Sequence, residues 1–278
     1  MNGNMQHVPE VLGIIAGSGT YPASMVAGAR RNGVARIAVA AFVNETDPAL
    51  EATVDAWECL KVGQLSRLSK FLQRQGVKHA VMCGQIAPKN LFALSPDFRL
   101  LLMLARLKER NAETLFGGIA DELAKDGITL LPATSFLEDH LPAPGHLCGP
   151  VRKARELVDV DFGLKIARET SRLDIGQTVV VRRGTVLAVE AFEGTNECIR
   201  RGGSMGKGKA TVVKVSKPNQ DFRFDVPVIG PLTIETAGAS GILVLAVEAG
   251  KTLLLDKAET ARLCEKLGVT LIAVQSPP

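Results

Sequence analysis

A continuous apolar run that ends on glycine and leads directly into a helical pattern constrains the fold of this chain most strongly. Residues 11–17 read VLGIIAG, and the stretch from Pro22 to Arg31 has helical spacing and is closed by Gly33. Unbroken apolar runs are typical of parallel strands buried on both faces. Further strands are expected at 35–42, 77–84 and 128–134, with helices at 64–75, 97–109 and 112–125. This alternation predicts an α/β domain, Rossmann-like, with a mostly parallel sheet.

The second half of the chain arranges its elements differently. Residues 138–150, EDHLPAPGHLCGP, hold three prolines and two glycines and are predicted to be a linker. A helix is expected near 159–172, followed by two strands joined by a short turn, and the tract 200–209, RRGGSMGKGK, is expected to be a flexible basic loop. Hairpin-linked strands indicate a mixed sheet. We therefore expect an N-terminal Rossmann-like domain (1–137), a linker (138–150) and a C-terminal mixed α/β catalytic domain (151–278).

Length and composition restrict the class of protein further. A chain of 278 residues is long enough for two domains. The net charge of +4 comes without a dense basic run, so nucleic acid is not an expected partner. Five scattered cysteines without a CxxC motif suit a reducing cytoplasm, and the polar N-terminus lacks the apolar segment of a signal peptide. Residues 99–108, RLLLMLARLK, are expected to form a core helix, with a membrane interface or an acyl-chain channel as alternatives.

The stretch 217–231, KPNQDFRFDVPVIGP, concentrates polar side chains: Lys217, Gln220, Asp221, Arg223 and Asp225. Burying unpaired charge is costly, so such a stretch is either solvated or handles a charged ligand. If 221–225 is extended, the two aspartates and Arg223 share one face. Carboxylates with that spacing suit a hard divalent cation, and an arginine beside them suits phosphate oxygens. A salt-bridged strand face without a ligand is the alternative.

Gly17, Ser18 and Gly19 form a turn between the first expected strand and helix. Glycine there lets backbone N–H groups approach a phosphate, and a helix N-terminus favours an anion. A tight turn without a ligand is the alternative. Pro22 stands where the third glycine of a dinucleotide fingerprint would fall, and no acid ends the second strand. A nicotinamide-dependent dehydrogenase is therefore not supported.

Other candidates follow the ends of expected strands. Gln85 and Lys89 come after the third strand, where ligands bind in open parallel sheets. Glu190 and Glu193, in VEAFEGTNE, are candidates for ligating a cation or orienting a water. Ordinary loops are the alternative in both places. Because HExxH and GxSxG are both absent, a hydrolase of this sequence is expected to use a hard cation on carboxylates.

Five stretches, in order, resemble the LpxI-type UDP-2,3-diacylglucosamine pyrophosphatases: VLGIIAGSGTYP, RLDIGQTVVV, VLAVEAFEGTNE, KPNQDFRFDVPVIGP and VEAGKTLLLD. The resemblance implies an enzyme of lipid A biosynthesis, cytoplasmic and peripheral to the cytoplasmic face of the inner membrane. Such enzymes hydrolyse the pyrophosphate bond of UDP-2,3-diacylglucosamine to UMP and 2,3-diacylglucosamine 1-phosphate (lipid X), with Mg2+ and with Mn2+ as a substitute. It also implies two domains with the nucleotide-sugar lipid between them, and it allows a homodimer.

The resemblance also implies roles for individual residues. Asp225 matches an aspartate needed for activity, and Asp221 aligns with an acidic position just upstream. Asp225, Asp221 and Glu193 are the expected metal ligands, with Arg223 and Lys217 stabilising charge on the phosphates. The expected substrate-binding residues are Gly17, Ser18, Gly19, Gln85, Gln177, Glu193, Gly194, Thr195 and Gln220.

This chain departs from the family pattern in two places. Asn196 replaces the aspartate of the usual EGTD, and Arg110-Asn111 stands where relatives often carry Gly-Asp-Asp. These departures keep open a second hypothesis, a non-catalytic sensor that binds a nucleotide sugar or a lipid phosphate. Tight substrate binding without UMP release would favour the sensor over the enzyme.

Overall fold

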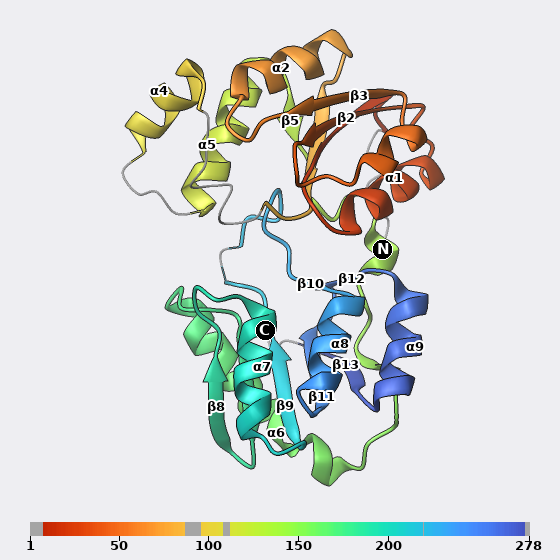
Figure 1. Cartoon of the computed structure of the whole chain (residues 1–278), viewed down its shortest axis with the longest axis vertical. Helices are drawn as coiled ribbons and strands as arrows, with labels where there is room; N and C mark the ends of the chain where they lie inside the picture. The colour runs from red at the N-terminus through yellow and green to blue at the C-terminus, as the bar shows by residue number, and fades with distance from the viewer. Residues whose placement is uncertain (1–7, 87–95, 108–111, 219, 276–278) are drawn as a thin grey trace. The chain divides into compact units, whose positions relative to one another are not determined.

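The computed structural model describes residues 8–86, 96–107, 112–218 and 220–275. Lys89, Arg110 and Asn111 lie outside these ranges. Contacts divide the chain into two units (Figure 1). The N-terminal unit holds the residues up to Leu137 together with Asp221–Asp225, and the C-terminal unit holds Glu138–Gln220 and the chain from Val226 onward. Both are α/β, which confirms the predicted fold class.

The N-terminal unit is built on five parallel strands in the order β3-β2-β1-β4-β5. The strands are β1 (Val11–Ala16), β2 (Arg36–Phe42), β3 (Ala56–Leu60), β4 (His79–Cys83) and β5 (Thr129–Leu130). The helices are α1 (Tyr21–Arg31), η1 (Pro48–Thr53), α2 (Leu65–Arg74), α4 (Phe98–Arg106) and α5 (Ala112–Lys125). Strands are added on one side of β1 up to β3, and the chain then continues on its other side with β4. The carboxyl ends of β1 and β4 therefore form a topological switch point, the usual ligand site of such sheets.

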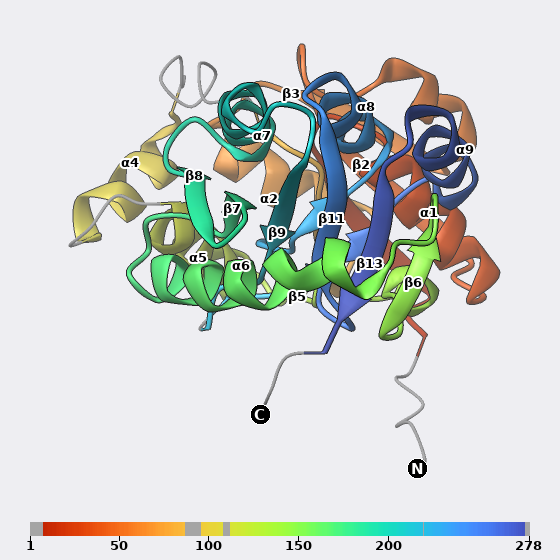
Figure 2. The same ribbon diagram turned by 90° about the horizontal axis from the view of Figure 1, so that it is seen from below.

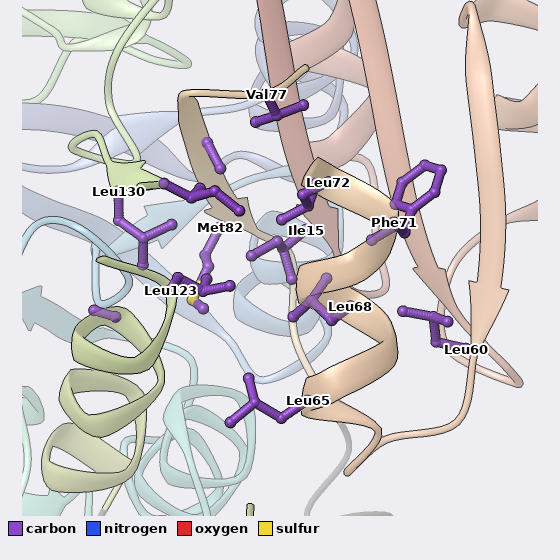
Figure 3. Close-up of a cluster of buried hydrophobic side chains, with 14 of the residues drawn as sticks. Ile15, Leu60, Leu65, Leu68, Phe71, Leu72, Val77, Met82, Leu123 and Leu130 are labelled. Carbon is purple, nitrogen blue, oxygen red and sulfur yellow. The ribbon is translucent and has the colours of Figure 1, made fainter. Parts of the chain in front are cut away.

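The spacing of apolar residues in α2 explains how this helix covers the sheet. Leu65, Leu68, Phe71 and Leu72 recur at helical intervals, so all four lie on one face and are buried against the sheet (Figure 3). Ile15 of β1 belongs to the same cluster (Figure 3). Each such side chain stabilises the fold by roughly 1.5–3 kcal/mol when fully buried. This core fixes β1 and β4, and with them the switch point.

The C-terminal unit contains a six-stranded mixed sheet in the order β6-β13-β11-β9-β7-β8 (Figure 2). Its strands are β6 (Gly145–Cys148), β7 (Thr178–Arg182), β8 (Thr185–Val189), β9 (Ala210–Lys214), β11 (Ile242–Glu248) and β13 (Thr270–Val274). A separate parallel pair is formed by β10 (Val228–Ile229) and β12 (Leu253–Leu254). Within the six-stranded sheet, β9, β11 and β13 are parallel and the outer strands are antiparallel. The edge strand β6 lies inside 138–150, the stretch expected to be a linker.

Helices cover both faces of this sheet. Figure 2 shows α6 (Ala154–Arg172) on one face and α7 (Thr195–Met205), α8 (Pro231–Ala239) and α9 (Lys257–Leu267) on the other. Two apolar clusters, one on each side, match this arrangement. The C-terminal unit is thus a three-layer structure with its own core.

The expectation of a flexible basic loop at 200–209 is wrong, because α7 continues through Met205. A Cβ at Gly202 would lie 2.4 Å from Cβ of Val180, and one at Gly203 would lie 2.3 Å from the carbonyl oxygen of Ser240. Glycine lowers helix propensity, but here it lets the helix approach its neighbours closely. Packing therefore outweighs local preference in this segment.

α4 has one buried and one exposed side. Leu100 and Met103 are buried, whereas Phe98 is 75% and Leu101 49% exposed. The structure therefore supports the expected core helix on one face only. Within the described ranges, no helix has both the length and the apolar character needed to cross a bilayer.

Candidate functional site

The glycine turn lies at the switch point of the N-terminal sheet, paired with the end of β4. Ser18 and Gln85 form an isolated antiparallel bridge, with Ser18 N–H donating to the Gln85 carbonyl at 2.8 Å and Gln85 N–H returning a bond at 3.2 Å. The Ser18 hydroxyl also donates to the Gln85 carbonyl, at 2.9 Å. A Cβ at Gly17 would lie 2.5 Å from that same carbonyl oxygen. The structure therefore brings three predicted residues together, and only glycine fits at position 17.

This pairing also decides which N–H groups remain for a ligand. Gly17 N–H donates to the Cys83 carbonyl at 2.8 Å, and Ser18 N–H is used by Gln85. Gly17 and Ser18 thus shape the turn, and the backbone donors facing a ligand must come from Gly19 and the first turn of α1. Next to this turn lies a cavity of about 490 Å³, lined in part by Gly19, Glu45 and Asp47.

Asp221–Asp225 belongs to the N-terminal unit and is a turn, so the extended conformation considered for it is wrong. The N–H of Asp225 donates to the Asp221 carbonyl at 3.0 Å, as in one turn of helix. The Phe222 carbonyl accepts a bond from Ala133 N–H at 2.6 Å. The Phe224 ring packs 5.6 Å from that of Phe116 on α5. Burial of Phe224 and these hydrogen bonds override the alternating pattern of the sequence.

The two aspartates of this turn have different surroundings. Both oxygens of Asp221 accept bonds from the Arg223 guanidinium, at 2.6–3.1 Å. The Arg223 hydrogen bonds lower the pKa of Asp221, and Asp221 in turn raises the pKa of Arg223. Among the described residues, the Asp225 carboxylate has no hydrogen bond or ion pair. Asp225 is therefore the carboxylate of the turn with oxygens available for a ligand.

The EGT residues lie at the start of α7 in the C-terminal unit. Glu193 forms an ion pair with Arg201, whose hydrogen bond lowers the pKa of the Glu193 carboxyl. The other Glu193 oxygen accepts the N–H of Ala191 at 3.1 Å. Gly194 precedes the helix with φ of 84°, a left-handed value that favours glycine. Glu193 thus fastens this loop to its own helix.

Lys217 and Gln220 also belong to the C-terminal unit and contact each other. Lys217 N–H donates to Oε1 of Gln220 at 2.9 Å, and the Lys217 ammonium pairs with Asp174. Within the part of the chain that the structure describes, the buried Nε2 of Gln220 has no hydrogen-bond partner. The predicted site residues therefore divide between the units. The N-terminal unit holds Gly17, Ser18, Gly19, Gln85, Asp221, Arg223 and Asp225. The C-terminal unit holds Gln177, Glu193, Gly194, Thr195, Lys217 and Gln220.

The structure adds Lys214, a residue that sequence reasoning missed, and gives Glu190 a defined place. Thr195 donates its hydroxyl to Oε1 of Glu190 at 2.9 Å and accepts a bond from Nζ of Lys214 at 2.8 Å. Lys214 is 6% and Glu190 7% exposed. A lysine inside the otherwise apolar strand ATVVKVS was the signal available in the sequence, because lysine is rarely buried without a partner.

No group of three or more His, Cys, Asp or Glu side chains is arranged to hold an ion in the part of the chain that the structure describes. Mg2+ often needs only one or two carboxylates, because it keeps waters and bridges to substrate phosphates. The available oxygens of Asp225 fit that kind of site.

The architecture defines the class of protein: a Rossmann-like α/β unit with a glycine turn at its switch point, combined with a mixed α/β unit. The chain belongs to the LpxI family, as the resemblance predicted. Its residues 11–140 match the LpxI N-terminal domain and residues 143–272 match the LpxI C-terminal domain. It is 32% identical over 275 residues to the UDP-2,3-diacylglucosamine pyrophosphatase LpxI of Caulobacter vibrioides, covering 95% of this chain and 97% of that relative.

Proposed function

We propose that this protein hydrolyses the pyrophosphate bond of UDP-2,3-diacylglucosamine and releases UMP and 2,3-diacylglucosamine 1-phosphate, a step of lipid A biosynthesis. The observation that carries the proposal is similarity along nearly the whole chain to a relative named for this activity. Both domains of the family are matched, so neither half of the relative lacks a counterpart here.

Asp225 is the central residue of the proposed site. Its carboxylate would hold Mg2+, or Mn2+ in its place, together with the substrate phosphates. The ion would neutralise the diphosphate and lower the pKa of a bound water. Asp221 and Glu193, the other candidate ligands, are ion-paired with Arg223 and Arg201. In this proposal Asp221 positions Arg223 instead of ligating the ion, and Glu193 fastens its loop to α7.

Positively charged and N–H groups of the N-terminal unit would stabilise the phosphates. The Arg223 guanidinium uses Nε and one Nη on Asp221, and its remaining Nη has no hydrogen-bond partner within the described residues. The free N–H groups from Gly19 into the first turn of α1 would contribute without a change of conformation. Lys217, the other cation expected to stabilise the phosphates, belongs to the C-terminal unit and pairs there with Asp174.

The acyl chains of the substrate suggest that the protein would bind at a membrane surface. The exposed apolar side chains of α4, among them Phe98 and Leu101, would support peripheral contact with the cytoplasmic face of the inner membrane. Co-sedimentation with vesicles of anionic phospholipid should fall for Leu101→Glu. Equal sedimentation of both proteins would contradict this contact.

The activity itself is tested by incubating purified protein with UDP-2,3-diacylglucosamine and Mg2+ and measuring UMP. We expect UMP release that EDTA stops and excess Mg2+ restores, because Asp225 alone offers too few ligands to retain an ion. Undiminished turnover after exhaustive chelation would show that hydrolysis does not require the ion. Tight binding of the substrate without release of UMP would contradict hydrolysis and favour the sensor hypothesis.

A further inference from the structure

Two of the five cysteines, far apart in the sequence, meet in the C-terminal unit. Cys148 is the last residue of the edge strand β6, and Cys264 lies in the last turn of α9. β6 pairs with β13, the strand that follows α9, and α9 packs beside β6 (Figure 2). Cys264 belongs to an apolar cluster of this unit, and Cys148 packs against that cluster. The fold therefore places side by side two thiols from opposite ends of the unit's sequence.

Close backbone contacts hold Cys148 beside the end of α9. The next residue, Gly149, has φ of 81°, and a Cβ on it would lie 2.0 Å from the Val269 carbonyl oxygen. Only glycine fits such a close approach. The N–H of Val269 in turn donates to the Cys264 carbonyl at 3.0 Å. The backbones of the two cysteines are thus joined through a single intervening residue of the turn between α9 and β13.

The two thiols contact each other but differ in accessibility. Cys148 is partly exposed, whereas Cys264 is fully buried. The Cys264 S–H donates a hydrogen bond to the Cys148 sulfur, which lowers the pKa of Cys148 and raises the pKa of Cys264. An oxidant is attacked by a thiolate and not by a thiol. Cys148 is therefore the thiol of this pair that an oxidant reaches and reacts with first, and Cys264 is close enough to react with the product.

The other three cysteines do not combine these properties. Cys83 and Cys198 are buried, and burial raises the pKa of both thiols, so neither readily forms a thiolate. Cys59 is exposed on β3, but β2 and β1 separate it from Cys83 on β4. Cys59 therefore serves as an accessible cysteine without a second thiol beside it in its own unit.

We propose that Cys148 and Cys264 form a reversible disulfide when hydrogen peroxide oxidises the protein. The Cys148 thiolate attacks one peroxide oxygen, the O–O bond breaks, and the expelled hydroxide takes up the proton that the Cys148 thiol released. The Cys264 sulfur then attacks the sulfur of the resulting sulfenic acid, and its proton leaves with the hydroxyl group as water. The two thiols are oxidised by two electrons, the peroxide is reduced to two waters, and β6 becomes covalently linked to α9. The inference is independent of the proposed hydrolase activity.

The test exposes the dilute full-length protein to increasing hydrogen peroxide. Remaining thiols are alkylated, and unreduced peptides are mapped by mass spectrometry. We expect a peptide in which Cys148 and Cys264 are cross-linked, and we expect dithiothreitol to return both residues to free thiols. Cys59→Ser, which removes the exposed cysteine of the other unit, is the control and should form the same cross-link.

Two further variants separate the two steps. Cys264→Ala removes the second thiol, so the sulfenic acid should persist on Cys148 and be labelled there by dimedone. Cys148→Ser leaves only the buried thiol, so neither a cross-link nor a dimedone label is expected at Cys264. Thermal unfolding shows whether each variant folds. If Cys264→Ala does not fold, the mapped cross-link of the wild type and its loss in Cys148→Ser still decide the inference.

Either of two results would overturn the inference. The first is wild-type protein in which Cys148 and Cys264 remain free thiols at a peroxide concentration that oxidises Cys59. The second is oxidation of Cys148 to the sulfinic acid without a cross-link, since this would show that the Cys264 sulfur does not reach the sulfenic acid.

Discussion

At the scale of single residues, two aspartates four positions apart have different chemical surroundings. Asp221 is neutralised by Arg223, while Asp225 has no partner among the described residues. The sequence identified both acids and the arginine between them. It could not show that the arginine folds back onto the first aspartate, because that depends on a turn that replaces the expected extended segment.

Replacing Arg223 with Gln should destabilise the fold at neutral pH but not at strongly acid pH. The Arg223 hydrogen bonds lower the pKa of Asp221 in the folded state. The stabilisation is therefore fully present above the unfolded-state pKa of about 3.9 and is lost as the pH falls through the lowered folded value. Because the pair is partly exposed, we expect at most about 1 kcal/mol at pH 7.

Chemical denaturation at a series of pH values measures this difference. Arg200→Gln, which breaks an exposed pair with Glu197, serves as the control. A stability difference for Arg223→Gln that stays constant from pH 7 to about pH 2 would rule out this linkage.

At the scale of elements, strands and helices with strong apolar periodicity were predictable and those governed by tertiary packing were not. β1, α1 and α2 lie where the sequence predicts them, because apolar runs, helical spacing and glycine stops mark them. β3, with the sequence AWECL, was not predicted, because it is short and contains a charged residue. The sequence predicted a loop where the second half of α7 lies, because paired glycines have low helix propensity and their close packing contacts depend on the fold.

Gly202→Ala should therefore destabilise the protein although alanine is the better helix former. The added Cβ would meet the Val180 side chain at 2.4 Å, and overpacking of that kind costs about 1–3 kcal/mol. Ser204→Ala, at an exposed position of the same helix, is the control and should be neutral or slightly stabilising. Thermal unfolding compares the two; equal or raised Tm for Gly202→Ala would show that the helix does not pack this closely.

At the scale of the whole molecule, the chain returns to its N-terminal unit for five residues before completing the C-terminal one. Asp221–Asp225 belongs to the N-terminal unit although it lies beyond residue 220. The sequence placed a domain change near 138 but gave no sign of this return, since the burial of Phe224 against α5 and the hydrogen bond from Ala133 to Phe222 depend on tertiary structure. The segment carrying Asp225 is thereby fixed to the unit that holds the glycine turn.

Phe224→Ala should loosen the N-terminal unit selectively. Phe224 packs against the apolar cluster of that unit but is only partly buried, so a loss of about 1–3 kcal/mol is expected, below that of a fully buried phenylalanine. Hydrogen exchange should quicken in α5 and leave β9 and β11 unchanged. Phe192→Ala, at a site 89% exposed, should alter neither region. Faster exchange confined to the C-terminal sheet would contradict the assignment of this segment.

The dependence of hydrolysis on Asp225 is tested most directly by single-turnover UMP release from UDP-2,3-diacylglucosamine. Asp225→Asn should fold like the wild type and slow release by about 10³-fold or more, since the carboxylate proposed to hold the ion is lost. Asp221→Asn should retain more activity, because its carboxylate is occupied by Arg223. Wild-type rates for folded Asp225→Asn would contradict the proposed site.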